Sequence, residues 1–290
     1  MVIKTSNLPQ PGETILGGNF FMNAGGKGAN QAVAAAKLGG AVTFFAKVGN
    51  DIFGEQAKIL FEKEGINTSY ILTDEKYPSG VALITVDEKG ENCIVVAPGA
   101  NNELTVDDLQ QQKKIIESAS IILMQLEIPL TTVEFVAGIA SKAKIKMVLN
   151  PAPACQLSDE LLEKINIITP NQKEAEMLTG IKVSDRKSAE EAALALYKKG
   201  IETVIVTLGS EGALLLDENE FNFINAPIVK AIDTTAAGDV FNGALVVALS
   251  EGMKMKDAVA FACRAASISV TKLGAQASAP TRNEVENFIF

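Results

Sequence analysis

The stretch Asp233-Thr234-Thr235-Ala236-Ala237-Gly238-Asp239 combines two carboxylates with small residues between two apolar segments. Residues 228–232 are typical of a strand and residues 240–249 of a buried helix. Small residues at a helix start let backbone N–H groups converge on an anion, and the helix dipole favours negative charge there. A carboxylate in the same turn could take a proton from a hydroxyl that attacks the anion. The stretch therefore outlines a phosphoryl-transfer site, although an ordinary helix start with an acidic first turn fits it too.

A second glycine-rich stretch, Gly25-Gly26-Lys27-Gly28-Ala29-Asn30-Gln31-Ala32, also opens a predicted helix. That helix covers residues 32–38 and should stop at Gly39-Gly40. In an α/β fold, two glycine-opened helices far apart in sequence can face one pocket. The chain has no Walker sequence Gly-x-x-x-x-Gly-Lys-Ser/Thr, and the second stretch lacks the spacing of a dinucleotide fingerprint.

Composition excludes several classes of function. The net charge of −9 argues against nucleic acid or an anionic membrane as a partner. Because the chain has no histidine, proton transfer must use a carboxylate, lysine, tyrosine or cysteine, and histidine-ligated zinc is excluded. No apolar run reaches the length of a membrane span, and three widely spaced cysteines suit a reducing compartment. We therefore expect a cytoplasmic protein that binds neither nucleic acid nor membrane.

From about residue 100 onward, strand-like and helical runs alternate, which predicts a parallel sheet with helices on both faces. The predicted strands cover residues 121–126, 146–149, 165–169 and 203–207, and the predicted helices cover residues 107–118, 132–141, 171–179 and 189–199. Residues 213–216 and 220–225 predict a hairpin across Asp217-Glu218-Asn219.

Two regions break this alternation. Residues 80–86 and 92–97 predict a further hairpin, and residues 1–4 and 14–22 are strand-like with no helix between them. Apolar strands without a covering helix need another surface. We therefore expect a small β-sheet lid from residues 1–23 and 80–97, and an α/β domain from residues 24–79 and 98–290. A plain antiparallel extension with no lid role is the alternative.

Together, the two glycine-rich stretches resemble the two signatures of the ribokinase (PfkB-type) family of carbohydrate kinases. Five further stretches follow the order found in that family: Leu126-Glu127-Ile128-Pro129, Asn150-Pro151-Ala152-Pro153, Thr169-Pro170-Asn171-x-x-Glu174, Thr207-Leu208-Gly209-x-x-Gly212 and Leu273-Gly274-Ala275-Gln276. The resemblance, which runs from Met1 to the C-terminus, implies a three-layer α/β sandwich with a mostly parallel sheet and a β-sheet lid. It implies transfer of a phosphoryl group from ATP to the terminal hydroxyl of a sugar, with D-ribose expected, and a homodimer formed through the lid.

The same resemblance implies roles for individual residues at the reacting centre. Asp239 is the expected general base, with a low pKa at its helix N-terminus, and Ala236, Ala237 and Gly238 form the expected backbone anion hole. The residues expected to meet the sugar are Gly26, Lys27, Gly28, Asn30, Glu127 and Asp239. Without the family, Glu127 fits a solvated acid at a strand end equally well.

By the same resemblance, Asn171 and Glu174 organise Mg²⁺ and the triphosphate, while an N-cap asparagine with a capping-box glutamate fits their spacing equally. Thr207, Gly209, Gly212, Gly238 and Cys263 complete the expected nucleotide contacts, although Thr207 to Gly212 also fits a simple strand-to-hairpin turn. Cys263 stands where the family often has an asparagine near the adenine. The residues expected to surround K⁺ are Asp233, Thr235, Ser269, Lys272, Gly274 and Ser278, with a buried contact between loops around Asp233 as the alternative.

The N-terminus departs from the family pattern. Family members begin with a core strand that runs into an Asn-x-Asp segment whose aspartate binds the sugar, whereas this sequence starts at Met1-Val2-Ile3, just beyond that segment. We interpret this as a gene start assigned to an internal methionine, with a truncated, weakened or inactive relative as the alternative. Two other functions stay open: a kinase of another sugar or of a nucleoside, and a catalytically dead sugar or nucleotide sensor.

Overall fold

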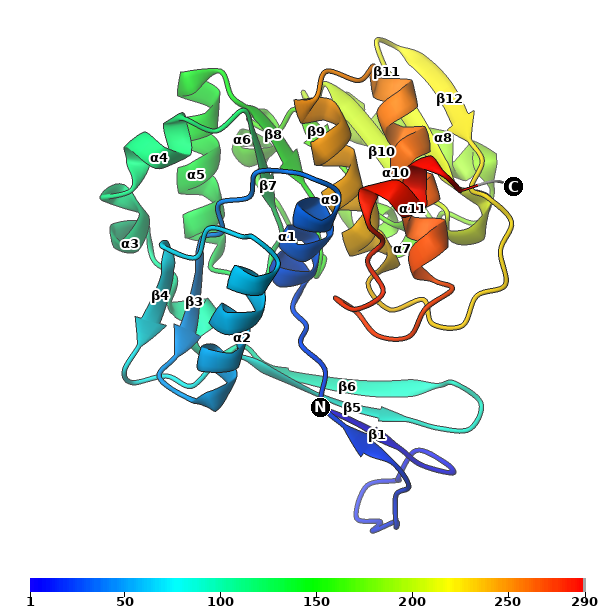
Figure 1. Ribbon diagram of the computed structural model, residues 1–290. Helices are drawn as coiled ribbons and strands as arrows, with labels where there is room; N and C mark the ends of the chain where they lie inside the picture. The colour runs from blue at the N-terminus through cyan, green and yellow to red at the C-terminus, as the bar shows by residue number, and fades with distance from the viewer. Residues whose placement is uncertain (289–290) are drawn as a thin grey trace.

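A six-stranded sheet of order β12-β11-β10-β9-β8-β7 runs through the body of the protein (Figure 1). The structure is a computed structural model, and it describes residues 1–288. The strands β7 (Ile121–Met124), β8 (Lys146–Leu149), β9 (Ile167–Ile168) and β10 (Thr203–Thr207) are parallel, and β11 (Ala213–Asp217) and β12 (Glu220–Ile224) continue the sheet as an antiparallel hairpin. The predicted parallel sheet and its terminal hairpin are therefore confirmed.

Helices cover both faces of this sheet. Successive side chains of a strand point to opposite sides, so each strand contributes to both apolar layers. On β10, Val204 and Val206 enter one apolar cluster and Ile205 enters another. The first cluster takes side chains from α3 (Val106–Gln110), α4 (Lys113–Glu117), α5 (Leu130–Ala143), α6 (Asp159–Leu162), α7 (Gln172–Thr179) and α8 (Arg186–Tyr197). The second takes them from α1 (Lys27–Lys37), α9 (Ala237–Ser250), α10 (Met255–Ser269) and α11 (Arg282–Glu286). The result is the expected three-layer α/β sandwich.

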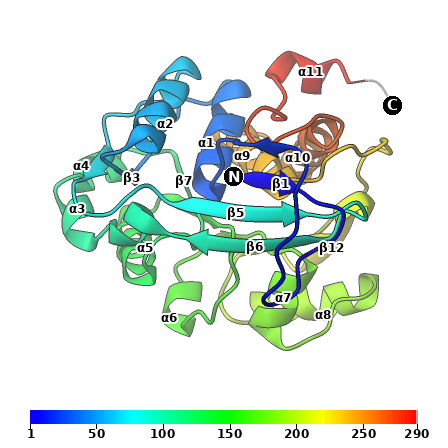
Figure 2. The same ribbon diagram turned by 90° about the horizontal axis from the view of Figure 1, so that it is seen from below.

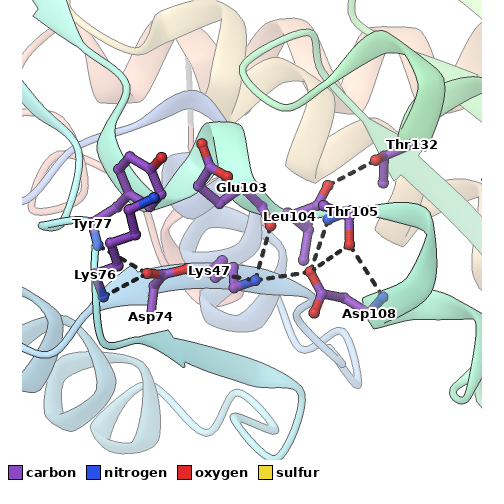
Figure 3. A network of polar contacts seen from close by, with 9 residues as sticks. All are labelled: Lys47, Asp74, Lys76, Tyr77, Glu103, Leu104, Thr105, Asp108 and Thr132. Carbon is purple, nitrogen blue, oxygen red and sulfur yellow. Dashed lines mark hydrogen bonds and ion pairs between the residues drawn. The ribbon is translucent and has the colours of Figure 1, made fainter.

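A separate parallel pair, β3 (Ala46–Gly49) and β4 (Ile71–Asp74), packs with α2 (Ile52–Lys63) beside this body. Figure 3 shows how Lys47 of β3 fastens the pair. Its Nζ atom donates hydrogen bonds to the carbonyl of Glu103 (2.9 Å) and to Oδ2 of Asp108 (3.0 Å), and it lies 3.6 Å from Oδ2 of Asp74. The side chain is only 14% exposed, so water screens these contacts weakly. Lys47 thus ties the pair to η1 (Gly99–Glu103) and α3.

A third sheet, of order β2-β1-β5-β6, lies apart from the body at the end where α1 begins (Figures 1 and 2). Its strands are β1 (Val2–Lys4), β2 (Phe20–Phe21), β5 (Val81–Val86) and β6 (Asn92–Ala97), and every residue of β6 is exposed. The hairpin expected at residues 80–97 is present, whereas the strand expected at 14–22 is reduced to two residues. The function of this sheet as a lid stays a prediction.

Several other expected elements differ in detail, among them the strand expected at 165–169, which is limited to Ile167–Ile168. Residues 228–232 form no strand: Ile228 is fully exposed, and the N–H groups of Ile232 and Asp233 donate to the carbonyl of Val270 at the end of α10 instead of to a strand. The helix expected at residues 107–118 is divided into α3 and α4. Helix α1 begins at Lys27 rather than at residue 32, because Gly26 with φ of 95° forms its N-cap and the glycine-rich stretch enters the helix.

Among residues 1–288, no helix combines the length and the apolar character that crossing a membrane requires.

Candidate active site

Helix α9 begins inside the stretch of small residues that ends at Asp239. Ala236 is its N-cap, in the left-handed conformation with φ of 61°, and Ala237 is the first helical residue. The first N–H groups of a helix have no acceptor within the helix, and the dipole adds positive potential at this end. Ala236 and Ala237 are half-buried and Gly238 is exposed, so the turn has the character of an anion site open to a ligand.

Two side-chain amides from α1 hold the carboxylate of Asp239, which is only 6% exposed. Asn30 Nδ2 donates to Oδ2 (2.8 Å) and Gln31 Nε2 donates to Oδ1 (2.9 Å). Burial raises the pKa of Asp239, and the two amide donors and the charge of Lys27 only partly offset that effect. The expected low pKa is therefore wrong, because loss of hydration outweighs the favourable helix end. A raised pKa brings the carboxyl group nearer to the range that suits a base at neutral pH.

Close contact between α1 and α9 brings these amides to Asp239. A β-carbon at Gly243 would lie 2.8 Å from both the Ala34 side chain and the Gln31 carbonyl, and 3.0 Å from the Ala35 nitrogen. Gly243 follows Asp239 by about one helical turn, and Ala34 and Ala35 follow the two amide residues by the same interval. The glycine contact therefore sets the register in which Asn30 and Gln31 face Asp239.

A chain of buried polar side chains continues from this contact to the ends of the parallel strands. Gln31 Nε2 also donates to Oδ1 of Asn150 (3.0 Å), after β8, and Asn150 Nδ2 donates to the carbonyl of Thr169 (3.2 Å), after β9. Thr169 Oγ1 donates to Oδ1 of Asn242 (2.6 Å), whose Nδ2 donates to the carbonyl of Gly238 (2.8 Å). The anion turn and the carboxylate are thus both anchored to the sheet.

Sequence reasoning missed Gln31 and Asn242 as site residues. Each is a 1% exposed amide that is followed by small or apolar helical residues. Such a residue needs buried hydrogen-bond partners, and this was the signal available in the sequence.

The predicted sugar residues meet beside Asp239. The Lys27 N–H donates to Oε2 of Glu127 (2.7 Å), which joins the first turn of α1 to the segment after β7. Burial raises the pKa of Glu127, and the N–H and the charge of Lys27 oppose that rise. Gly26 and Gly28 flank Lys27, and a β-carbon at Gly28 would lie 2.8 Å from Oε1 of Gln125. The structure therefore brings all six predicted sugar residues to one place.

Asn30 has one feature that points to a ligand. Its Oδ1 atom is buried and accepts no hydrogen bond from any residue in the range 1–288, while its Nδ2 atom is used by Asp239. An unpartnered buried acceptor is rare and costly, so a donor such as a hydroxyl group is expected there.

Asn171 and Glu174 form the capping box of α7. The N–H of Asn171 donates to Oε2 of Glu174 (2.8 Å), and the N–H of Glu174 donates to Oδ1 of Asn171 (2.9 Å). Burial raises the pKa of Glu174, the Asn171 N–H and the charge of Lys27 lower it, and the negative charge of Asp239 raises it further. Glu174 therefore caps a helix and also faces the same region as Asp239.

The remaining predicted nucleotide residues have separate environments. Thr207 pairs with Asn171 in an isolated parallel bridge, so the ends of β9 and β10 lie together. Gly212 has φ of 105° and a β-carbon there would lie 2.0 Å from the Ile224 carbonyl, so the hairpin itself requires this glycine. Gly209 has open space around it. The side chain of Cys263 is only 3% exposed within the second apolar cluster, and burial raises its pKa to about 12. Its contact with a nucleotide stays a prediction.

The predicted cation residues lie where two loops meet at Asp233. Its Oδ1 accepts from the Thr235 N–H and its Oδ2 from the Gly274 N–H, both at 2.9 Å. Burial favours a higher pKa for Asp233, but bonds from Thr235 and Gly274 outweigh it, so the pKa is lowered and the carboxylate stays charged. Ser269, the last residue of α10, and Ser278, in the second loop, are both buried. The Lys272 side chain pairs with Glu284 (2.6 Å).

Known proteins resemble this chain along nearly its whole length. Residues 1–282 match the model for pfkB family carbohydrate kinases. The chain is 49% identical to a ribokinase from Haemophilus influenzae, over 99% of this chain and 94% of the relative. The solved structure of ribokinase from Thermotoga maritima superposes with a TM-score of 0.89 at 40% identity, covering 98% of this chain and 94% of that one. The structure of Arabidopsis thaliana ribokinase complexed with ribose and ATP has a TM-score of 0.90 at 32% identity, covering 98% and 93%.

We predict that Gly243→Ala separates α1 from α9 and weakens both hydrogen bonds to Asp239. Overpacking of this kind costs about 1–3 kcal/mol in the free energy of unfolding. The measurement is urea unfolding, with Gly138→Ala on α5 as the matched control, because a β-carbon at Gly138 meets open space. The control should be neutral or up to about 1 kcal/mol more stable, since alanine favours helix. Equal effects of the two substitutions would show that the helix contact is not tight.

Proposed function

This chain belongs to the pfkB family of carbohydrate kinases, and from that premise we propose that it transfers a phosphoryl group from ATP to the terminal hydroxyl of D-ribose, forming D-ribose 5-phosphate. The similarity to ribokinases, one of them solved with ribose and ATP, supports this acceptor. One observation carries the proposal: the buried carboxylate of Asp239 lies in the first turn of α9, directly after the turn of small residues at Ala236, Ala237 and Gly238.

In this mechanism the acceptor hydroxyl lies between Asp239 and the turn at Ala236, Ala237 and Gly238. Phosphoryl transfer passes through a loose transition state, so the hydroxyl keeps its proton until late and Asp239 accepts it then. The backbone N–H groups of the turn stabilise the charge on the transferring group without having to reorganise. The sugar is oriented by the remaining polar groups around it, which are Gly26, Lys27, Gly28, Asn30 and Glu127.

The nucleotide would lie along the ends of β9 and β10, against Asn171, Glu174, Thr207, Gly209 and Gly238. No group of three or more acidic or cysteine side chains able to hold a metal occurs in the described residues 1–288. In the proposal, Mg²⁺ would be held mainly by phosphate oxygens and water, as is usual for this ion with nucleotides. Glu174 is the side chain that would orient that water. When bound, Mg²⁺ would neutralise charge on the phosphates.

K⁺ is the second cation in the proposal. The loops around Asp233 supply a charged carboxylate and backbone carbonyls, the oxygen donors that hard cations prefer. Both polar atoms of the Gln276 side chain, in the loop that follows Gly274, are buried without a partner among the described residues, so this region has polar groups that a further ligand could satisfy. The carbonyls of Asp233, Thr235, Ser269, Lys272 and Gly274 and the hydroxyl of Ser278 would surround the ion.

We further propose that residues 1–23 and 80–97 act as a lid over the sugar and join two chains into a homodimer. On β5 and β6 the cross-strand neighbours Leu83 and Val95 are each more than half exposed, and so is Val96 on the other face. Exposed apolar residues gathered on a small sheet are typical of an interaction surface. We also propose a cytoplasmic location for the protein.

We expect Asp239→Asn to lower turnover by about 10²–10⁴-fold, because an amide cannot accept the hydroxyl proton. The measurement is ADP release from Mg²⁺-ATP with D-ribose. The matched control is Asp107→Asn, an exposed position in the first turn of α3, which should keep the activity of the unmodified chain. Turnover in Asp239→Asn above a tenth of normal would remove Asp239 from the role of base. Binding of ribose without ADP release by the unmodified chain would indicate a sensor instead.

We expect K⁺ to stimulate ADP release more than Na⁺ does at equal ionic strength, and Asp233→Ala to abolish the difference. Without its carboxylate, the Gly274 and Thr235 N–H groups lose their acceptor and the two loops separate. Glu218→Ala, at the exposed β11–β12 turn, is the control and should preserve the K⁺ effect. An identical response to both cations in the unmodified chain would contradict the cation site.

For the lid interface, light scattering should give the mass of two chains rather than the 30.6 kDa of one. Val95→Lys and Val96→Lys place a charge on opposite faces of the sheet, and we expect one of them to yield monomers. Leu194→Lys, on α8 in the body, should remain a dimer. A monomer for the unmodified chain at micromolar concentration would rule out the dimer.

A further inference from the structure

Gln31 is the most buried polar side chain next to the reacting carboxylate, and both ends of its amide are used. It is 1% exposed. Nε2 donates to Oδ1 of Asp239 (2.9 Å) and to Oδ1 of Asn150 (3.0 Å), while Oε1 accepts a short hydrogen bond from Nε2 of Gln125. One amide therefore joins α1 to α9 and to the segments that follow β7 and β8.

The chemistry of its partners leaves this amide one orientation. An ionised carboxylate only accepts hydrogen bonds, so the Gln31 atom that faces Asp239 must be nitrogen. In the reverse orientation Oε1 would face two oxygens and Nε2 would face the Gln125 amide nitrogen. A buried network with every member satisfied is rigid, whereas one reversed amide would leave several groups unpaired.

The two oxygens of Asp239 consequently have different surroundings. Oδ1 accepts a hydrogen bond from Gln31, which is almost fully buried. Oδ2 lies on Asn30, whose own Oδ1 atom is the buried acceptor without a partner in residues 1–288. The side of the carboxylate that bears Oδ2 is therefore the side prepared for a ligand.

We propose that Gln31 is a positioning residue that holds Oδ1 of Asp239 toward the sheet and so presents Oδ2 to the acceptor hydroxyl. The proposal rests on the proposed function, in which Asp239 is the base. Gln31 does not touch the substrate; it acts through Asp239, and Gln125 and Asn150 act in turn through Gln31. Because misplacement of a reacting group by about 1 Å can cost 10²-fold in rate, this fixed orientation contributes directly to turnover.

The amide also affects ionisation. Burial raises the pKa of Asp239, and Gln31 is one of the groups that lower it again, with Asn30 and Lys27. Glu127 and Glu174 are the acidic groups that face the same carboxylate. Without the Gln31 donor, Asp239 keeps its proton to higher pH, and a protonated carboxyl group cannot act as a base.

Gln31→Met tests this proposal, because methionine keeps the length of the side chain and removes the amide. We expect kcat to fall roughly tenfold to a hundredfold, with the KM for D-ribose little changed and the acidic limb of the kcat profile moved to higher pH. Gln125→Met removes the donor to Oε1 of Gln31 and so holds Gln31 less firmly, and it should give a smaller change in the same direction. Thr132→Val is the control: it removes a buried hydrogen bond to the Leu104 carbonyl in which no site residue takes part, and should lower Tm while leaving the pH profile unchanged.

A second readout does not depend on turnover. The ¹³C signal of the Asp239 carboxyl group, assigned by its loss in Asp239→Asn, should titrate at higher pH in Gln31→Met than in the unmodified chain. Gln31→Met could instead leave both the titration and the kcat profile unchanged and only lower Tm, as Thr132→Val does. That result would make Gln31 a structural residue and overturn the proposal. If the unmodified chain releases no ADP, the proposed function fails, and the titration still decides whether Gln31 holds the carboxylate.

Discussion

The contact between α1 and α9 at Gly243 is the constraint on which the site depends. A carboxylate as buried as Asp239 is costly unless donors replace the water it has lost. Those donors come from α1, more than two hundred residues away in the sequence, and they reach Asp239 only because no side chain separates the helices at Gly243. Small residues at Gly243, Ala34 and Ala35, one turn inside each helix, therefore allow the helices to approach closely enough for these hydrogen bonds.

Charge at the site has to be reconciled with a chain whose net charge is −9 and whose proposed co-substrate is a polyanion. Asp239, Glu127 and Glu174 all face the region of Lys27, and burial raises the pKa of each. The positive charge of Lys27 acts on all three acids and opposes the effect of burial. The N-terminus of α9 adds positive potential without a further basic side chain.

The segments just before β5 and just after β6 are held together at the edge of the body. Asp51 accepts hydrogen bonds from the backbone N–H (2.7 Å) and the hydroxyl (2.7 Å) of Ser79, immediately before β5, and a β-carbon at Gly99 would lie 2.2 Å from the Pro78 carbonyl. Lys47 fastens the neighbouring η1 segment (Figure 3). The chain segments before β5 and after β6 therefore leave the body side by side, while β2 leads separately into α1.

The sequence alone determined what is encoded locally: the alternation of strands and helices, both hairpins, the helix that starts after Asn171, and the carboxylate at the start of α9. These features follow from periodicity and turn chemistry, which neighbouring residues specify. Only the tertiary structure decided that residues 228–232 pair with no strand, that Cys263 is enclosed, that the pKa of Asp239 is raised, and that Gln31 holds that carboxylate. Each of these depends on burial and on partners distant in the chain, and the identity of such partners is set by packing.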